Sequence, residues 1–527
     1  MTRSGPPFAR VLVANRGEIA VRIIRACHEM GMEAVAVYSD ADVDAVHVRM
    51  ADEAVRLGPP APRDSYLRID SVVQAALDTG CGAIHPGYGF LAERAAFARA
   101  VEQASLVFVG PNSHAIEALG DKLNARRLAA ELGVPSVPGT LEPALVERPD
   151  QVATIIEAAR RIGYPLLVKA AAGGGGRGMR RVTHAEDLPA ALASGSSEAL
   201  SAFGDGSVYL EREVRPARHI EVQLLGDVFG TVVALGERDC SLQRRHQKLV
   251  EEAPAPGLTE KERRHVHGLA IRLGAAAGLR SAATCEFLYD TDRNFWFLEV
   301  NTRLQVEHGV TELVAGVDIV REQFRIAAGL PLSPAVIAAG ERAATPDSAS
   351  IEVRIAAEDP SSAFAPTPGR VSRWVMPAGP GVRVDTAMGP GGRVPPDYDN
   401  LIAKVMVHAP DRDAAIDRLA RALEETEVGG LQTTLPFHRA VASSDAFRRA
   451  ELSTDWVEAH WNGEAARASA VRCALLAAGL ASIEAKPGRA DIAGSPARSA
   501  GDGPEPRAAT PSWRRSGRIE GVDRWPT

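Results

Sequence analysis

The stretch EFLYDTDRNFWFLEVNTRLQVE, which begins at residue 286, contains acidic side chains that could bind a divalent cation. Tyr289 and Trp296 flank the polar turn DTDRN, and this pattern predicts a β-hairpin. Pairing Tyr289 with Trp296 places Glu286 opposite Glu299. Because like charges directly opposite each other destabilise a sheet, the two carboxylates predict a cation between them, and their oxygens suit Mg²⁺ or Mn²⁺.

The second half of this stretch alternates polar and apolar residues. In an extended segment every second side chain shares a face, and one face would be wholly polar, with Glu299, Asn301, Arg303, Gln305 and Glu307. A half-exposed edge strand also alternates in this way. Asparagine and glutamine are poor strand formers, however, and two acids with an arginine and two amides favour a functional site.

Lysine is scarce in this chain, whereas arginine is abundant. Lysine and arginine total 60, and the lysines are Lys122, Lys169, Lys248, Lys261, Lys404 and Lys486. Where arginine is so strongly preferred, a lysine suggests a requirement for a compact point charge. Lys122 opens a predicted helix, Lys169 ends a predicted strand, and Lys248 lies in the basic segment QRRHQK. Glu251 and Glu252 follow that segment, so an exposed, salt-bridged loop is the alternative there.

A run of glycines, AAAGGGGRGM, follows the strand predicted over 164–169. Glycines leave backbone N–H groups free to turn toward one point, where they can cradle phosphate oxygens. The spacing of a Walker A motif is absent. Flexible linkers are longer and rich in serine, whereas this run lies between two predicted strands, with Lys169 before it and Arg177 within it. We therefore expect a mobile phosphate-binding lid.

Length and composition indicate a multidomain globular protein. A chain of 527 residues exceeds one hydrophobic core, and 45% hydrophobic content supports packed domains. The net charge of −7 gives no basic field for nucleic acid, and no apolar run reaches the length of a membrane span. The first residues lack the apolar region of a secretory signal. Five scattered cysteines without CxxC spacing favour a cytoplasmic location and exclude a disulfide framework or a zinc site.

The N-terminal region is expected to be a doubly wound α/β domain that ends near Gly120. Short apolar runs, each followed by a polar or Gly/Pro turn and a helical pattern, predict strands at 11–14, 34–38, 83–85 and 107–109. The dinucleotide motif GxGxxG is absent after the first strand, where NRGE stands instead.

The rest of the chain predicts mixed α/β and α+β structure. Strands are expected at 208–214, 219–225, 232–236, 285–289 and 295–300, and helices at 260–278, 318–329 and 411–425. Residues 330–346 are expected to be a connector, and several strands from residue 350 onward indicate an α+β domain that ends near Trp461. An Ala-rich helix can follow Asn462, and the Pro/Gly/Ser/Arg bias from Lys486 predicts disorder.

Taken together, eight segments resemble those of a biotin carboxylase, an ATP-grasp enzyme, over about residues 10–460. They are VLVANRGEIAVRIIRAC, AIHPGYGFL, GDK, KAAAGGGGRGM, RHIEVQ, ERDCSLQRRHQKLVEEAPAP, FLEVNTRLQVEH and IAAEDP. The resemblance implies an N-terminal domain over 1–121, an ATP-grasp domain over 122–332 with a lid at about 141–213, a C-terminal domain over 333–461, and a partly disordered tail over 462–527.

The same resemblance implies an activity. Biotin carboxylases phosphorylate bicarbonate with MgATP to carboxyphosphate and pass CO₂ to N1′ of biotin on a carrier protein. This is the first half-reaction of an acyl-CoA carboxylase, so the implied partners are a biotin carboxyl carrier protein and a carboxyltransferase subunit, with a homodimer expected. The final acceptor, an acyl-CoA or a keto acid, is not implied.

The resemblance also implies roles for individual residues. The nucleotide and its phosphates would be bound by Lys122, Lys169, Gly175, Gly176, Glu211, Val214, His219, Gln243, His246 and Leu288. Lys248 would contact the γ-phosphate and bicarbonate, while Glu286, Glu299 and Asn301 would bind the metals. Bicarbonate would meet Arg303, Gln305 and the backbone of Val306, with Glu307 as general base and Arg354 stabilising the enolate-like biotin oxygen.

Four positions depart from the pattern of the family. Arg94, Ala171, Gly309 and Ala356 stand where the family commonly has Asn, Ser, Pro and Asn. None of these substitutions removes a catalytic side chain. They bear on the ordering of loops and on turnover, rather than on the type of reaction.

Two other functions are weighed against this one. Another ATP-grasp ligase, such as a carbamoyl-phosphate synthetase half or a purine-pathway carboxylase, would share the glycine loop and metal ligands but not QRRHQK together with NTRLQVEH. A catalytically silent nucleotide-binding subunit would have no need of the intact Lys248, Arg303, Glu307 and Arg354.

Biotin itself is expected on a separate carrier. Carrier domains present the modified lysine in a tight hairpin, typically between two methionines, and no methionine of this chain is followed by lysine. Lys486 lies in EAKPGR, where the following proline disfavours a regular hairpin.

Overall fold

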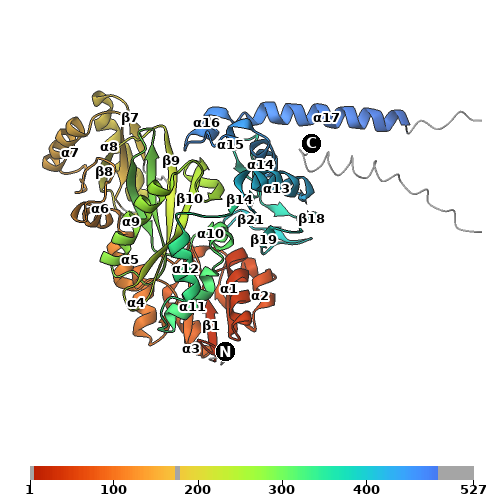
Figure 1. Cartoon of the computed structure of the whole chain (residues 1–527), viewed down its shortest axis with the longest axis horizontal. Helices are drawn as coiled ribbons and strands as arrows, with labels where there is room; N and C mark the ends of the chain where they lie inside the picture. Colours follow the sequence, from red (N-terminus) through yellow and green to blue (C-terminus); the bar gives the residue numbers. More distant parts are fainter. Residues whose placement is uncertain (1–4, 172–178, 485–527) are drawn as a thin grey trace, which may run out of the picture.

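The computed structural model of the chain describes residues 5–171 and 179–484 (Figure 1). The lid glycines Gly175 and Gly176 and the tail expected to be disordered from Lys486 lie outside these residues. The N-terminal domain is confirmed as doubly wound, with a parallel sheet in the order β3-β2-β1-β4-β5. Its elements are β1 (Arg10–Val13), α1 (Gly17–Glu29), β2 (Glu33–Ser39), α2 (Val46–Met50), β3 (Glu53–Gly58), α3 (Ile69–Asp78), β4 (Ala83–His85), α4 (Ala95–Gln103) and β5 (Val107–Phe108).

The strand order reverses at β1, where the loops after β1 and β4 meet. Asn15 follows β1, and its amide donates hydrogen bonds of 2.7 Å to the carbonyl oxygens of Pro86 and Tyr88. In an open α/β sheet, ligand sites form where neighbouring strands feed helices on opposite faces. The NRGE and PGYGF segments of the sequence are therefore joined at this edge.

A small antiparallel sheet, in the order β7-β6-β8, forms a separate layer with its own apolar core. Three helices precede it in the chain, after the N-terminal domain. The elements are α5 (Ser113–Gly120), α6 (Lys122–Glu131), α7 (Pro149–Ile162), β6 (Leu166–Ala170), β7 (Arg180–Val182), α8 (Leu188–Phe203) and β8 (Val208–Arg212).

The largest sheet has eight antiparallel strands in the order β13-β12-β9-β10-β11-β14-β21-β19. It joins strands before residue 333 to strands after it, because β11 pairs directly with β14. The strands are β9 (Ala217–Gly226), β10 (Val232–Arg244), β11 (Gln247–Ala253), β12 (Ser281–Asp290), β13 (Phe295–Asn301), β14 (Ala349–Ala356), β19 (Val382–Thr386) and β21 (Leu401–Ala409).

Helices cover both faces of this sheet (Figure 1). Alternation along β9 sends Leu224 into the core beneath α9 and Leu225 into the core shared with α1, α11 and α12. The covering helices are α9 (Glu260–Ala276), α10 (His308–Ala315), α11 (Ile319–Ala327), α12 (Pro334–Arg342), α13 (Arg412–Glu425) and α14 (Leu435–Ala442). Further elements complete the C-terminal region: β15 (Glu358–Asp359), β16 (Ala365–Pro366), β17 (Gly369–Arg370), β18 (Arg373–Val375), β20 (Arg393–Val394), β22 (Glu427–Gly429), α15 (Asp445–Arg448) and α16 (Trp456–His460).

The connector predicted over 330–346 is wrong, because this segment contains α12. Ser333 caps the helix by accepting a hydrogen bond from the backbone of Val336, and Pro334 occupies the first turn. Val336 and Ala339 pack into the core beneath the large sheet. The Ser-Pro pair is an ordinary helix-start signal, so the sequence did contain the information.

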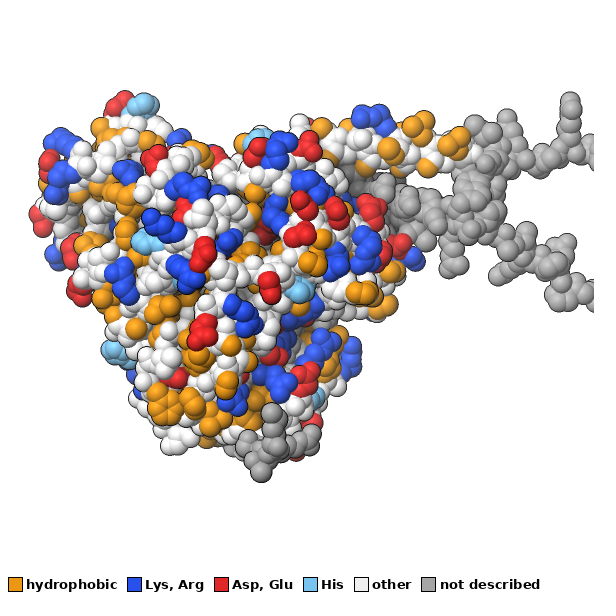
Figure 2. All heavy atoms as spheres, in the orientation of Figure 1, with side chains coloured by type: hydrophobic (Ala, Val, Ile, Leu, Met, Phe, Trp, Pro, Cys, Tyr) orange, Lys and Arg blue, Asp and Glu red, His pale blue; other side chains and the backbone are white. Residues whose placement is uncertain are grey.

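A final helix, α17 (Gly463–Glu484), projects from the body of the protein (Figure 1), in agreement with the Ala-rich helix expected there. Hydrophobic side chains lie exposed along it in Figure 2, and they include Val471, Leu475, Leu476 and Leu480. Within the described part of the chain, no helix combines the length and apolarity that crossing a bilayer requires.

Candidate active site

The hairpin β12–β13 pairs Glu286 with Glu299, as predicted, but by a different register. Tyr289 pairs with Phe295 and not with Trp296, which lies opposite Leu288. A β-bulge between Glu286 and Phe287 then shifts the pairing by one residue. The predicted Tyr289–Trp296 pair is therefore wrong, and the extra residue of the bulge restores the pairing of the two acids.

The polar residues after β13 do not continue a strand. The strand ends at Asn301, and a turn leads from there into α10. Arg303 organises this turn: its guanidinium donates to Asn301 Oδ1 at 3.2 Å, to Gln305 Oε1 at 2.9 Å and to Glu93 Oε2 at 2.9 Å. The single polar face is thus wrong as secondary structure, although Asn301, Arg303 and Gln305 do meet.

Lys248 lies at the centre of the site, on β11. Its ammonium donates to Glu221 at 2.5 Å, to Glu307 at 2.7 Å and to Glu286 at 3.1 Å. Burial alone would lower the pKa of Lys248, but the three carboxylates raise it well above its ordinary value. Lys248 is therefore a fixed, buried positive charge, and the exposed loop considered for this segment is replaced by the β10–β11 hairpin.

Glu307 is fully buried at the start of α10. Besides Lys248, it accepts a hydrogen bond of 3.0 Å from the guanidinium of Arg354 on β14. Burial would raise its pKa, but Lys248, Arg354 and Arg238 hold the pKa well below the ordinary value. Arg354 also donates to Glu251 at 2.6 Å, so Glu307 and Glu251 share one guanidinium.

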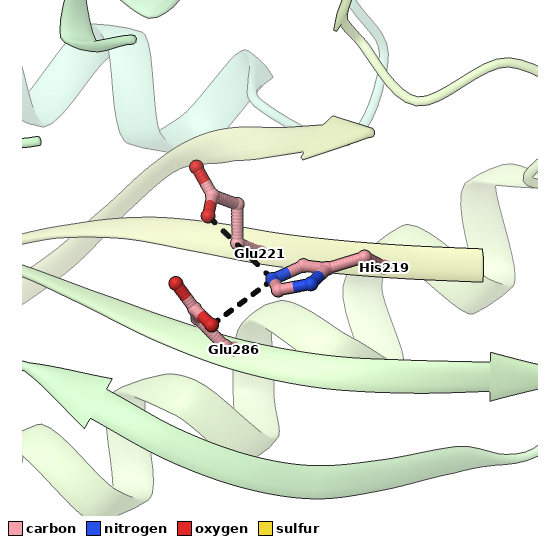
Figure 3. A group of neighbouring side chains, drawn as sticks. All are labelled: His219, Glu221 and Glu286. Atoms are coloured by element: carbon pink, nitrogen blue, oxygen red, sulfur yellow. Dashed lines mark ion pairs between the residues drawn. The ribbon is translucent and has the colours of Figure 1, made fainter. Parts of the chain in front are cut away.

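The carboxylates of Glu221 on β9 and Glu286 on β12 both lie beside the imidazole of His219 on β9 (Figure 3). His219 Nε2 lies 3.0 Å from one oxygen of Glu286 and 3.9 Å from one oxygen of Glu221. Burial opposes protonation of His219, yet Glu286 raises the pKa of its imidazole. His219, expected to bind the nucleotide, therefore lies against one of the expected metal ligands.

Glu221 and Arg238 also belong to the site, although they were not predicted from the sequence. Arg238 on β10 is fully buried and donates to Glu221 at 2.5 Å, to Gln223 at 2.9 Å and to Thr311 at 2.8 Å. The signal was the alternation of His219, Glu221 and Gln223 in RHIEVQ, the same pattern of polar residues at every second position that singled out Glu299 to Glu307.

The two lysines expected at phosphates each contact an acid of the site. Lys122, the first residue of α6, lies 2.9 Å from Glu299, which raises the pKa of its ammonium. Lys169 on β6 lies 2.6 Å from Glu211 on β8. Arg126 on α6 binds the other oxygen of Glu211 at 2.8 Å, so this buried acid links α6 to the small sheet.

Gln243 and His246 belong to the β10–β11 hairpin. Gln243 is buried and pairs directly with Lys248. Arg245 and His246 form the two-residue turn, with φ of 48° and 65°. Such turns normally use Asn-Gly, so an Arg-His pair in the left-handed region is a strained arrangement of the kind found at functional sites.

The other two residues expected to bind the nucleotide, Leu288 and Val214, are partly buried. Leu288 on β12 is the cross-strand neighbour of His219. Val214 lies just after β8, in the segment that leads to β9. Near the expected bicarbonate residues, the carbonyl oxygen of Val306 accepts a hydrogen bond of 2.7 Å from Lys404.

The donor set expected for metal fits a hard divalent cation. Glu286 and Glu299 lie opposite each other, and Asn301 is hydrogen-bonded to Glu286 at 2.8 Å. Carboxylate and amide oxygens are the ligands that Mg²⁺ and Mn²⁺ prefer. In this structure Lys248 neutralises Glu286 and Lys122 neutralises Glu299, so repulsion between the acids does not by itself require a metal.

Two of the four departures from the family pattern have a local effect. Arg94 is the N-cap of α4 and makes no side-chain cap, which an asparagine would supply. Gly309 lies in the first turn of α10, and a side chain there would collide with the sulfur of the buried Met406. The backbones of the other two pair with neighbouring segments: Ala171 donates to Ser207, and Ala356 pairs with Thr434.

Comparison with known families covers most of the chain in three consecutive segments. The model for the biotin carboxylase N-terminal domain matches residues 7–116, and that for the biotin carboxylase C-terminal domain matches residues 352–459. Between them, residues 121–335 match the ATP-binding domain of the carbamoyl-phosphate synthase L chain.

Similar proteins align with this chain over nearly their whole length. Biotin carboxylase 1 of Bacillus subtilis is 46% identical over 452 residues, which are 86% of this chain and 98% of that protein. A pyruvate carboxylase subunit of Methanothermobacter thermautotrophicus is 46% identical over 456 residues, which are 86% of this chain and 91% of that protein.

Solved structures of biotin carboxylases are also similar to this chain. A biotin carboxylase complex from Campylobacter jejuni has a TM-score of 0.81 and 42% identity, covering 86% of this chain and 99% of that one. The biotin carboxylase domain dimer of Hydrogenobacter thermophilus 2-oxoglutarate carboxylase, in complex with MgADP and bicarbonate, has a TM-score of 0.80 and 44% identity, covering 86% of this chain and 98% of that one. The chain therefore belongs to the biotin carboxylase family.

Proposed function

We propose that the chain carboxylates biotin on a carrier protein, using ATP and bicarbonate through carboxyphosphate. The observation that carries this proposal is the buried contact of Glu307 with both Lys248 and Arg354, which puts a base between two fixed cations. Phosphoryl transfer depends mainly on positioning and charge neutralisation, and bicarbonate needs a base to become a nucleophile. Membership of the family supports the same reaction.

The domain boundaries expected from the sequence, after residues 121, 332 and 461, are part of the proposal. The lid proposed over about 141–213 includes the small sheet and its separate core, which supports its movement as one layer. The continuous large sheet means that the second boundary does not separate two independent cores.

Lys122 and Lys169 are proposed to bind phosphate oxygens of ATP, with the backbone of Gly175 and Gly176 closing over them. Each lysine is now paired with an acid, so phosphate would compete for it. The rest of the nucleotide is proposed to contact the lining residues Glu211, Val214, His219, Gln243, His246 and Leu288. Burial of Glu211, His219 and Gln243 supports a fixed lining.

Glu286, Glu299 and Asn301 are proposed to hold Mg²⁺ or Mn²⁺. When bound, such an ion neutralises charge on the phosphoryl group that is transferred. The three residues come from two paired strands and supply oxygen donors.

Glu307 is proposed to take the proton of bicarbonate, which Arg303, Gln305 and the backbone of Val306 would bind. Its low pKa in this structure makes it a weak base. Lys248 is the first of the cations that cause the low value, so an anionic substrate that drew Lys248 away would make Glu307 more basic. Arg354 is proposed to leave Glu307 and then to stabilise the negative oxygen of biotin.

The proposed partners are a biotin carboxyl carrier protein and a carboxyltransferase subunit, with the chain itself as a homodimer. The similar protein of Methanothermobacter thermautotrophicus is named as a subunit of pyruvate carboxylase, and one similar structure is a dimer. These likenesses support the proposal without identifying the acceptor.

The test is ADP release by the purified chain with free biotin as acceptor. We expect release to require bicarbonate and to increase with biotin. Another ATP-grasp ligase would release ADP with a different nucleophile, and a silent nucleotide-binding subunit would release none. A rate of ADP release that does not change with the concentration of biotin would contradict the proposal.

A further inference from the structure

Two buried glutamates lie side by side behind Arg354, and neither belongs to the reaction scheme above. Glu251 on β11 and Glu352 on β14 are direct cross-strand partners, and both are fully buried. Residues directly opposite each other on a sheet have side chains in contact range, and like charges there are destabilising. A pair of ionised carboxylates in this position requires compensation.

The cations nearby are already engaged. Arg354 binds one oxygen of Glu251 and one of Glu307. Lys404, opposite Arg354 on β21, lies 3.1 Å from Glu18 and donates to the carbonyl of Val306. Within residues 5–171 and 179–484, these contacts leave no direct ion pair for Glu352.

One side of Glu352 is apolar. Its other cross-strand neighbour is Met406, and α10 packs over this face of the sheet with Val310 against Met406. Among the described residues, both oxygens of Glu352 and the second oxygen of Glu251 have no hydrogen-bond partner. Three unsatisfied buried oxygens on two facing acids are costly unless a proton joins them.

We propose that Glu251 and Glu352 hold one proton between them, and that this proton keeps Arg354 available to Glu307. Two carboxylates in one buried site do not both ionise at neutral pH when one of them has no counter-ion, and the shared proton converts one into a hydrogen-bond donor for the other. Glu352 is then a positioning residue that acts through Arg354. The kinetic part of this inference rests on the proposed function, whereas the shared proton does not.

The electrostatic environment agrees with this geometry. Burial raises the pKa of Glu352 well above the ordinary value and also raises that of Glu251. The charged groups that act on the pair include Arg354 on β14, Lys248 on β11, Lys404 on β21 and Glu307 at the start of α10. Beyond these, Arg383 on β19 lies opposite Met406, the neighbour of Glu352, and His308 follows Glu307 on α10.

Loss of the proton has a defined consequence. The proton passes to solvent, and a second negative charge appears beside Arg354. That charge weakens the attraction of the guanidinium for Glu307 and for a negatively charged biotin oxygen. Turnover should therefore decline on the alkaline side, by about tenfold per pH unit if only the protonated pair is active.

Infrared spectroscopy of the full chain tests the proton directly. We expect a carbonyl band of a protonated carboxyl group at neutral pH that Glu352→Gln removes and that fades in the wild type as the pH rises. The difference between wild type and variant isolates this pair from other buried acids. Glu322→Gln, which alters a buried acid on α11, is the matched control and should leave the band.

Kinetics supply the second measurement. Glu352→Gln should remove the alkaline decline of kcat, because Glu251 is left alone with Arg354 and stays ionised. Glu251→Gln is the second variant if the first fails to fold: Glu352, which has no ion pair among the described residues, should then keep the proton by itself, so the band should shift in frequency but remain at neutral pH. A wild-type spectrum without a protonated carboxyl at neutral pH overturns the inference whatever the variants do. A wild-type band that persists in Glu352→Gln overturns it too.

Discussion

At the scale of single residues, the site depends on how Glu307 is shared. Its two oxygens face Lys248 and Arg354, and this double contact explains why a carboxylate can remain ionised while fully buried. A carboxylate held by two cations is a weak base until a substrate competes for one of them. That arrangement protects the site from taking a proton from water before substrates arrive.

Replacing Glu307 tests its assignment as the base. Glu307→Gln should retain ATP binding and lose bicarbonate-dependent turnover by roughly 10²-fold or more, because an amide cannot accept the proton. Nucleotide binding by calorimetry and ADP release at saturating bicarbonate measure the two effects. Glu322→Gln serves as a buried-acid control, and near-normal turnover of the Glu307 variant would remove this residue from the mechanism.

A second prediction concerns Gly309, where the family commonly has proline. A methyl group at this position would meet the sulfur of Met406, which is fully buried and cannot move into solvent. Gly309→Ala should therefore lower the free energy of unfolding by about 1–3 kcal/mol. Denaturant titration measures the loss.

The control for that prediction is Gly268→Ala. Gly268 lies inside α9 with open space around it, so alanine should stabilise the helix by about 0.5–1 kcal/mol. Combining Gly309→Ala with Met406→Ala should give less than the sum of the single losses, because the two side chains compete for one space. Additive losses would mean that the collision does not cause the effect.

At the scale of elements, the hairpin β12–β13 places two acids from adjacent strands at one point. Glu286→Gln or Glu299→Gln should raise the Mg²⁺ concentration needed for half-maximal ADP release, since each removes a charged oxygen donor. Glu260→Gln alters an exposed acid on α9 and should leave the requirement unchanged. Equal effects in all three variants would contradict a metal site at this hairpin.

Sequence patterns predicted the β12–β13 hairpin correctly, but they did not predict its register. The Glu286–Glu299 pair was inferred from a register that is wrong at Tyr289, and a bulge, which no residue type announces, corrects it. Alternation identified Asn301, Arg303 and Gln305 as neighbours, yet it cannot distinguish a strand from a turn held together by one arginine.

Other parts of the site depend on long-range pairing. Arg354 reaches Glu307 only because β14 joins the sheet next to β11, a contact between segments far apart in sequence. The doubly wound domain was predictable because its strands and helices follow one another along the chain. The burial of Lys248 was not, because its three acids come from β9, β12 and the start of α10.

At the scale of the whole molecule, we predict that the chain carries no biotin of its own. Co-expressed with an active biotin ligase, it should stay unlabelled in a streptavidin blot, because no lysine follows a methionine and Lys486 precedes a proline. The same preparation should carboxylate biotin on an added carrier protein, which serves as the positive control in the blot. A biotinylated peptide that contains Lys486 would contradict this prediction.

The strand order of the eight-stranded sheet affects how the protein folds during its synthesis on the ribosome. The partner of β11 is synthesised about 100 residues later, which takes roughly 5–20 s at ordinary rates of translation. Until β14 emerges, the edge of β11, with its buried acids and apolar flanks, stays open to other nascent chains. The yield of active protein should thus depend on chaperones or slow growth during this interval, and a chain released before β14 is complete should aggregate.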